Sequence, residues 1–302
     1  MKTPIFTGAC VAIVTPYTEN GINFDKLGEL IERQIAGGTD AICICGTTGE
    51  ASTQTIEEHK AAIEYCVKKV DHRVKVIAGT GSNCTMTALD LSLYAESCGA
   101  DGLLIVTPYY NKATQTGLIK HYTYIADRVH TPIIMYNVPS RTGTKFTAET
   151  YYELSKHPMI NGIKEASGDF SLAIHTLQLC GDNINIWSGN DDQVVPLMSL
   201  GAKGVISVAS NVKPELMVEM SHLCLEGKFA EAAQLQVSTI ELMDALFVEV
   251  NPIPVKVALN MMGLEVGNLR MPLCDMSAAH KEVLSKALMN AGLEVKNPNA
   301  SA

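Results

Sequence analysis

Eight short apolar segments recur along the chain up to about residue 208, and helical patterns separate them. Each segment is rich in Val and Ile and nearly continuous in hydrophobicity, which is typical of parallel strands buried on both faces. Alternation of this kind indicates βαβ units, and eight of them predict an α/β protein with a closed (β/α)8 barrel (a TIM barrel) rather than an open sheet. The segments are 9–15, 40–45, 74–79, 101–107, 132–137, 160–165, 183–188 and 204–208, and the helical patterns between them are 25–36, 56–70, 85–98, 115–130, 147–156, 170–180 and 190–200.

Beyond the last strand segment the pattern is helical throughout. Gly227 and Gly263 stand where helix caps are expected. We therefore predict a barrel over residues 1–226 and a C-terminal helical module over 227–302, ending in a frayed tail at 297–302. The helical segments are 213–226, 228–248, 253–263 and 277–292.

Composition and charge exclude several classes of protein. The net charge of −9 argues against a nucleic-acid-binding protein, which needs a surface of clustered Lys and Arg. No apolar run approaches the roughly 20 residues of a membrane span, and residues 9–14 are too short for a signal peptide. The nine cysteines include no Cys-x-x-Cys pair. Cys43 and Cys45 could bind a soft metal, but we interpret them as apolar side chains on one face of a strand. We expect a cytoplasmic protein with reduced thiols, and neither nucleic acid nor a membrane as its partner.

Lys164 is the sharpest candidate for catalysis. Active sites of such barrels lie at the C-terminal ends of the strands, and Lys164 stands near that end of the sixth segment. If Ile163 faces the outer helices, the alternation of side chains along a strand turns Lys164 into the barrel mouth. Burial of an amine there favours the neutral nucleophile that an imine requires. The alternative is a structural lysine paired with Glu165 or Asp169, and strand neighbours such as Glu165 point to the opposite face.

Polar groups also follow the second, fourth and fifth segments. The run 46–50, Gly-Thr-Thr-Gly-Glu, offers backbone N–H groups and two hydroxyls to a carboxylate, although an ordinary turn with a helix cap has the same composition. Tyr109, Tyr110 and Tyr136 are candidates for proton transfer, with amphipathic packing as the alternative. Arg141 carries a planar fork suited to a carboxylate, or is an ordinary surface arginine.

Other catalytic signatures are missing from the sequence. The eight histidines show no His-Glu-x-x-His spacing, and there is no Gly-x-Ser-x-Gly elbow of a serine hydrolase. We therefore predict a lysine-dependent aldolase or lyase that needs neither a metal nor another cofactor.

Three motifs in register with strand ends resemble those of one enzyme family. They are Gly-Thr-Thr-Gly-Glu at 46–50, Tyr-Asn-Val-Pro-x-Arg-Thr-Gly at 136–143 and Gly-Ile-Lys-Glu-Ala-Ser-Gly-Asp at 162–169, and Asn-Pro-Ile-Pro-Val-Lys follows at 251–256. Together they resemble the dihydrodipicolinate synthase family of the class I pyruvate-dependent aldolases, from about residue 4 to residue 292. The resemblance implies condensation of pyruvate with L-aspartate 4-semialdehyde in diaminopimelate and lysine biosynthesis.

The resemblance also implies roles for single residues. Lys164 would form the imine with pyruvate, and Tyr136 would shuttle protons beside it. Thr48 would link Tyr136 to Tyr110, which would reach in from a neighbouring subunit of a homotetramer built as a dimer of dimers. Thr47 and Thr48 would bind the pyruvate carboxylate, and Arg141 the carboxylate of the second substrate. Two further positions would line the pocket through backbone groups: Gly189 and Ile206.

A regulatory cleft is implied as well, with departures from the pattern of lysine-inhibited members. The positions concerned are Ala51, Ser52, Ile56, His59, Asn83, Thr87 and Tyr109. Ala51, Ile56 and Thr87 replace a serine, a histidine and a glutamate of sensitive members. Without that acid a lysine amino group lacks its natural partner, so we expect weak or absent feedback inhibition.

Three other functions remain open at this point. A sister enzyme such as N-acetylneuraminate lyase, or another 2-keto-acid aldolase, would keep the lysine and tyrosine and differ in its second substrate. A pyruvate-binding regulatory barrel would bind pyruvate without covalent attachment. A purely structural barrel would leave the three motifs unexplained.

Overall fold

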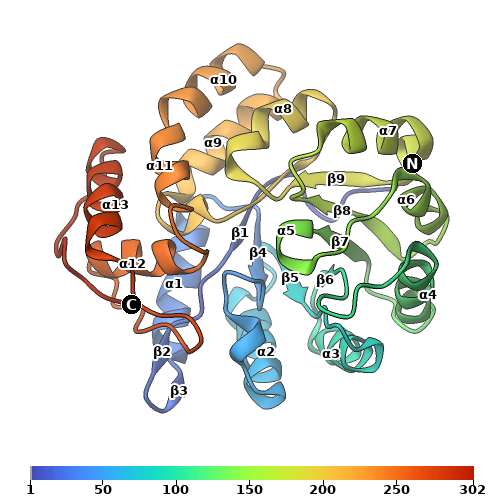
Figure 1. Cartoon of the computed structure of the whole chain (residues 1–302), viewed down its shortest axis with the longest axis horizontal. Helices are drawn as coiled ribbons and strands as arrows, with labels where there is room; N and C mark the ends of the chain where they lie inside the picture. The colour runs from blue at the N-terminus through green and yellow to red at the C-terminus, as the bar shows by residue number, and fades with distance from the viewer. Residues whose placement is uncertain (1) are drawn as a thin grey trace.

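The computed structural model describes residues 2–302, and its centre is a closed barrel of eight parallel strands (Figure 1). All eight predicted strands are confirmed. Around the barrel their order is β1 (Gly8–Ala12), β4 (Ala41–Ile44), β5 (Lys75–Gly79), β6 (Gly102–Val106), β7 (Ile133–Asn137), β8 (Ile160–Glu165), β9 (Asn185–Ser188) and β10 (Gly204–Ser207), which pairs back with β1.

Helices follow the strands and cover the outside of the barrel (Figure 1). Three of them have the predicted bounds because the chain marks their ends clearly; Thr55 and Glu58, for example, form a reciprocal capping box that starts the second helix. The barrel helices are α1 (Phe24–Ala36), α2 (Ile56–Val70), α3 (Thr85–Cys98), α4 (Gln115–Ala126), α5 (Pro139–Thr142), α6 (Ala148–Ser155), α7 (Phe170–Cys180), α8 (Val194–Ser199) and α9 (Pro214–Leu225).

Three short elements escaped the sequence analysis. A hairpin of β2 (Tyr17–Thr18) and β3 (Gly21–Ile22) precedes α1, and α5 is a single turn. Strands of two residues are too short for a periodic pattern. The interpretation of Cys43 and Cys45 as one strand face is wrong: β4 ends at Ile44, Cys45 has a left-handed backbone with φ 56°, and it packs in the outer layer while Cys43 lies inside the barrel.

Side chains alternate between the barrel interior and the helix layer, as period-2 strands require. In β8 the side chain of Ile163 belongs to the outer layer, as predicted. The interior is filled by small and branched side chains around one stacked aromatic pair, Phe6 and Trp187, whose ring centroids are 5.1 Å apart. Those interior side chains include Cys10, Ala12, Cys43, Ile77, Leu104, Ile134 and Ile206. The barrel is therefore a packed core, and only its mouth is open to chemistry.

The C-terminal helices continue from the helix layer around α8 and α9 toward the side of the barrel where α1 lies (orange to red in Figure 1). They are α10 (Phe229–Ser238), α11 (Ile240–Ala245), α12 (Ile253–Met261) and α13 (Ala278–Asn290). The single helix predicted at 228–248 is thus two helices that meet at Thr239. Gly227 and Gly263 follow the caps of α9 and α12 with positive φ, which glycine adopts most easily.

The expected fraying of residues 297–302 is also corrected. Ala300 and Ala302 are buried, and the Ser301 carbonyl accepts a hydrogen bond of 2.7 Å from Asn260 Nδ2. The tail therefore packs against α12. Within residues 2–302, none of the helices combines the length and hydrophobicity that crossing a bilayer requires.

Candidate active site

Lys164 lies inside the barrel mouth, and its side chain is only 6% exposed. Its neighbours across the strands are Tyr136 on β7 and Trp187 on β9. The Lys164 Nζ stands 4.4 Å from the centre of the Tyr136 ring. Within the described residues no hydrogen bond or ion pair engages this Nζ. The barrel therefore buries one lysine that has a tyrosine beside it and no acid bound to it.

Glu165 points the other way, into the helix layer. Its carboxylate accepts hydrogen bonds from Asn137 Nδ2 at 3.1 Å, from the Ser167 backbone N–H at 2.8 Å and from the Tyr151 hydroxyl at 3.4 Å. Burial raises the pKa of Glu165, and these bonds partly oppose that rise. The structural alternative for Lys164, a pair with Glu165, is therefore excluded.

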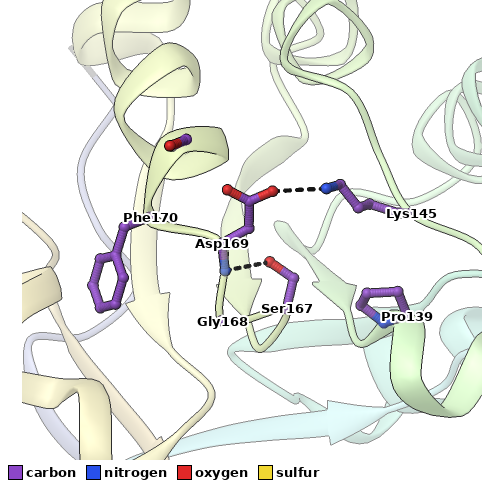
Figure 2. Close-up of a pocket in the computed structure, with 7 residues that line it drawn as sticks. Pro139, Lys145, Ser167, Gly168, Asp169 and Phe170 are labelled. Carbon is purple, nitrogen blue, oxygen red and sulfur yellow. Dashed lines mark hydrogen bonds and ion pairs between the residues drawn. The ribbon is translucent and has the colours of Figure 1, made fainter.

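Asp169, the other acid considered for Lys164, caps α7 and pairs with Lys145 at 2.7 Å. Figure 2 shows this pair at the edge of an open hollow of about 530 Å³ between α5 and the start of α7. The hollow is lined by Pro139, Lys145 and residues 167–171. It contains none of the predicted site residues, and both partners of the ion pair belong to its wall.

The loop after β4 forms the wall nearest the C-terminal helices. Thr48 is 2% exposed. The Gly49 carbonyl accepts the Thr15 hydroxyl at 2.7 Å and the Gln54 amide at 3.2 Å, which fixes the turn. Glu50 ends the loop in a left-handed conformation with φ 54°. The loop is thus held by its own surroundings without any substrate.

A buried ion pair joins this loop to α12. Lys256 Nζ lies 2.8 Å from Glu50 Oε1, and neither side chain is exposed. Lys256 also donates to the Asn268 carbonyl at 2.8 Å, while Glu50 Oε2 accepts the Arg270 N–H at 2.9 Å. Burial lowers the pKa of Lys256, and the charge of Glu50 opposes this. Both residues lie within the recognised motifs, but 206 residues separate them, so no local pattern could reveal the contact.

Asn251, just before α12, is the residue that sequence reasoning missed at the site. Its Nδ2 lies 3.1 Å from Thr48 Oγ1, and its backbone carbonyl accepts a hydrogen bond of 3.0 Å from Arg141 Nη2. In the sequence, Asn251 is distinguished only as the first residue of the motif Asn-Pro-Ile-Pro-Val-Lys at 251–256. Its contact with two candidate site residues depends on how the C-terminal helices fold back onto the barrel.

One cavity of about 420 Å³ is lined by three of the expected substrate-site residues. Thr47, Tyr136 and Arg141 line it, and so do most of the expected regulatory positions. These are Ala51, Ser52, Ile56, His59, Thr87 and Tyr109. Part of the expected substrate site therefore shares a hollow with most of the expected regulatory positions, whereas Lys164 and Thr48 do not line it.

His59 contributes a neutral ring to this cavity. Burial lowers its pKa, and its Nε2 donates to the Gly79 carbonyl at 2.7 Å. Asn83 lies outside the cavity wall, where its carbonyl accepts the Asn111 amide at 2.9 Å. The regulatory set is thus divided between the cavity and an adjoining loop.

The remaining candidates lie deeper or farther out. A Cβ on Gly189 would stand 3.1 Å from Lys164 Cε, so glycine there leaves room for the lysine side chain. Ile206 is fully buried in the barrel interior. Tyr110 is 90% exposed on a left-handed residue of φ 72°, and it does not line the cavity. Among the described residues, Thr48 bonds Asn251 and forms no hydrogen bond with Tyr136 or Tyr110.

Comparison with known proteins agrees with this geometry. A sequence model described as the dihydrodipicolinate synthetase family matches residues 5–291. A 4-hydroxy-tetrahydrodipicolinate synthase of Thermoanaerobacter sp. (strain X514) is 55% identical, over 96% of this chain and 98% of that protein.

Solved structures agree as well. The dihydrodipicolinate synthase of Aquifex aeolicus superimposes with a TM-score of 0.95 at 43% identity, over 97% of this chain and all of that one. The chloride-inhibited enzyme of Acinetobacter baumannii, solved with pyruvate, gives 0.93 at 41% identity, over 95% of this chain and 99% of that one. These likenesses set aside the sister aldolases and the non-catalytic barrels. The chain therefore belongs to the dihydrodipicolinate synthetase family, and its activity is that of a 4-hydroxy-tetrahydrodipicolinate synthase of lysine biosynthesis, a lyase of the class I aldolase type.

Proposed function

We propose that Lys164 carries the reaction as an imine with pyruvate. The amine would attack the keto carbon of pyruvate, a carbon–nitrogen bond would form, and the keto oxygen would leave as water. The supporting observation is a lysine that is 6% exposed at a strand end, with Tyr136 beside its Nζ and no acid bound to it. No hydrogen bond or ion pair within the described residues occupies the amine, so it is free to attack a carbonyl carbon.

Tyr136 would move protons between water and the imine. Its hydroxyl belongs to a ring that both packs against Lys164 and lines the cavity, so it can reach the bound intermediate. The phenol is 7% exposed, which limits exchange with bulk water. Proton transfer would thus stay within the site.

The two substrate carboxylates would bind different residues of the site. The pyruvate carboxylate would lie against Thr47 and Thr48, and the backbone groups of Gly189 and Ile206 would line the pocket. Arg141 would bind the carboxylate of L-aspartate 4-semialdehyde. Only one of its five N–H donors is used by the Asn251 carbonyl, so a two-pronged bond to a carboxylate remains available.

Tyr110 would act across a subunit interface. A tyrosine that is 90% exposed next to a catalytic mouth suits a position covered by a second subunit. We propose a homotetramer built as a dimer of dimers, in which the Tyr110 hydroxyl of one subunit completes the Thr48–Tyr136 relay of another. Sedimentation of the parent and of Tyr110→Phe would test this, with mass unchanged and turnover reduced as the expected result.

Feedback inhibition by lysine would be weak or absent. Thr87 lines the cavity next to Ile56 and offers no carboxylate to a lysine ammonium group. Assays at rising lysine concentration would check this, and half-inhibition below the millimolar range would contradict it. Thr87→Glu, which restores an acid, is expected to increase sensitivity.

The barrel domain would end at residue 226, and the protein would be cytoplasmic. The boundary at residue 226 follows the end of α9, which packs on β1 and β10 as the last helix of the barrel. All nine cysteines are free thiols, six of them buried, which suits the reducing cytoplasm.

The imine is tested by intact-mass spectrometry after borohydride treatment with pyruvate. The parent is expected to gain one reduced pyruvyl group on the peptide that holds Lys164, and Lys164→Ala is expected to gain none. An adduct that persists in Lys164→Ala and maps to another lysine, such as Lys256, would contradict the assignment. A parent that folds and binds pyruvate without an adduct would refute the imine itself.

A further inference from the structure

Asn251 connects two groups that belong to different substrates in the proposed function. Thr48 comes from the loop after β4 and Arg141 from α5, and they lie 203 and 110 residues from Asn251 in sequence. Asn251 is 5% exposed, so both contacts are shielded from water. One residue of the C-terminal helical region thus contacts residues proposed to bind both substrates.

The contact with Asn251 makes the Thr48 hydroxyl oxygen a hydrogen-bond acceptor. An amide Nδ2 only donates, so Thr48 Oγ1 accepts this bond and its own proton is left for another partner. Thr48 is almost fully buried, and a buried hydroxyl proton without an acceptor is unfavourable. The Tyr136 oxygen or a bound carboxylate can serve as that acceptor when substrate is present.

The other polar atom of the Asn251 side chain, Oδ1, is left without a partner among the described residues. Asn251 Oδ1 is buried and has no hydrogen-bond donor within residues 2–302. A residue that served only packing would avoid an unpaired buried acceptor. The bond to Thr48 is the one hydrogen bond that the Asn251 side chain makes within residues 2–302.

We propose that Asn251 is a positioning residue that sets the direction of the proton relay. Its side-chain amide makes Thr48 a donor toward Tyr136, so the phenol proton is turned to the imine on Lys164. Its backbone carbonyl separately holds Arg141. This inference rests on the roles proposed for Thr48, Tyr136 and Arg141.

The two contacts predict a split between kinetic constants. Substitution of the side chain removes the bond to Thr48 but leaves the backbone carbonyl that holds Arg141. Asn251→Ala is expected to lower kcat about tenfold or more, the kinetic equivalent of one lost hydrogen bond. The KM for L-aspartate 4-semialdehyde is expected to stay within about twofold, because uniform binding of that substrate is untouched.

Asn251→Asp makes the test specific. It has nearly the same shape as asparagine, but an ionised carboxylate only accepts, so it would draw the Thr48 proton away from Tyr136. Asn251→Asp is therefore expected to be no more active than Asn251→Ala. Parent-like kcat in Asn251→Asp would overturn the inference, since shape alone would then suffice.

Asn260→Ala serves as the matched control. Asn260 lies on α12, bonds the Gly267 carbonyl at 3.1 Å and the Val266 N–H at 2.7 Å, and touches none of the proposed site residues. It is expected to lower Tm with kcat unchanged. A parallel rise of both KM values in the Asn251 variants would assign a merely structural role and overturn the inference.

Borohydride trapping separates this inference from the proposed function. The Asn251 variants are expected to accumulate the pyruvyl adduct as the parent does, only more slowly. Failure of the parent to form the adduct would refute the proposed function. An adduct in the parent, together with Asn251 variants of full kcat, would refute the role of Asn251 alone.

Discussion

The chain buries two lysines near the barrel mouth, and their surroundings differ in one respect. Lys256, from the C-terminal helices, has a carboxylate 2.8 Å away and neither partner is exposed. Lys164, from the barrel, is 6% exposed and has the ring of Tyr136 beside it, with no ion pair among the described residues. Burial alone therefore does not identify a nucleophile. The difference lies in the Nζ atom, which an ion pair occupies in Lys256 and which is left free to react in Lys164.

Exchange of each lysine for methionine, which has a similar length and no charge, should separate the two roles most sharply. Lys164→Met is expected to abolish synthase activity, since methionine cannot form an imine. Its thermal stability is expected to stay close to that of the parent, because within residues 2–302 Lys164 forms no ion pair or hydrogen bond whose partner would be left alone. Activity assays and calorimetry on the same preparation would check both. A marked loss of Tm would mean that Lys164 is structural.

Lys256→Met should show the reverse pattern. It leaves Glu50 buried without its partner, and breaking such a pair costs about 3–5 kcal/mol of stability. Urea unfolding is expected to show this loss, while pyruvate still forms its adduct on Lys164 in the folded fraction. The double variant Glu50→Gln/Lys256→Met removes both charges and is expected to recover part of the loss. No recovery would mean that the pair matters through packing alone.

His121 on α4 extends the comparison to a buried group that stays neutral. Its Nδ1 lies 2.9 Å from Thr85 Oγ1, and burial lowers its pKa from 6.5 to about 4. Between those values the unfolded chain binds a proton that the folded protein does not. Stability is therefore complete above about pH 6.5 and falls by about 3 kcal/mol as the pH drops to about 4. Urea unfolding across this range should show a shallower slope for His121→Leu than for the exposed control His130→Leu.

Substitution of Lys2 is expected to change stability least among these variants. This lysine is paired with neither an acid nor a substrate. Its Nζ donates to the carbonyls of Ser155, His157 and Ile160 at 2.5–2.7 Å, which fastens the N-terminus to the turn before β8. Lys2→Met is expected to cost about 1–3 kcal/mol, because carbonyls lose charged donors. Turnover per folded molecule should not change. A fall in kcat would show that this turn influences Lys164 along β8.

Much of the fold could be read from local patterns. All eight strands were predicted, and α2, α3 and α7 have the predicted bounds, because apolar periodicity and cap residues act over a few neighbours. The failures lie where distant packing decides. The hairpin at 17–22 has strands of two residues, the helix at 228–248 divides at Thr239, and the tail at 297–302 docks against α12.

The sequence by itself determined the barrel and the place of Lys164, since side chains alternate along a strand and strand ends form the mouth. Only the tertiary structure decided that, among the described residues, Lys256 and not Lys164 forms an ion pair, and that its partner is Glu50. It also decided that Asn251 bonds both Thr48 and Arg141. The physical reason is distance along the chain. These contacts join residues 110 to 206 positions apart, and they form only because the C-terminal helices fold back over the barrel mouth.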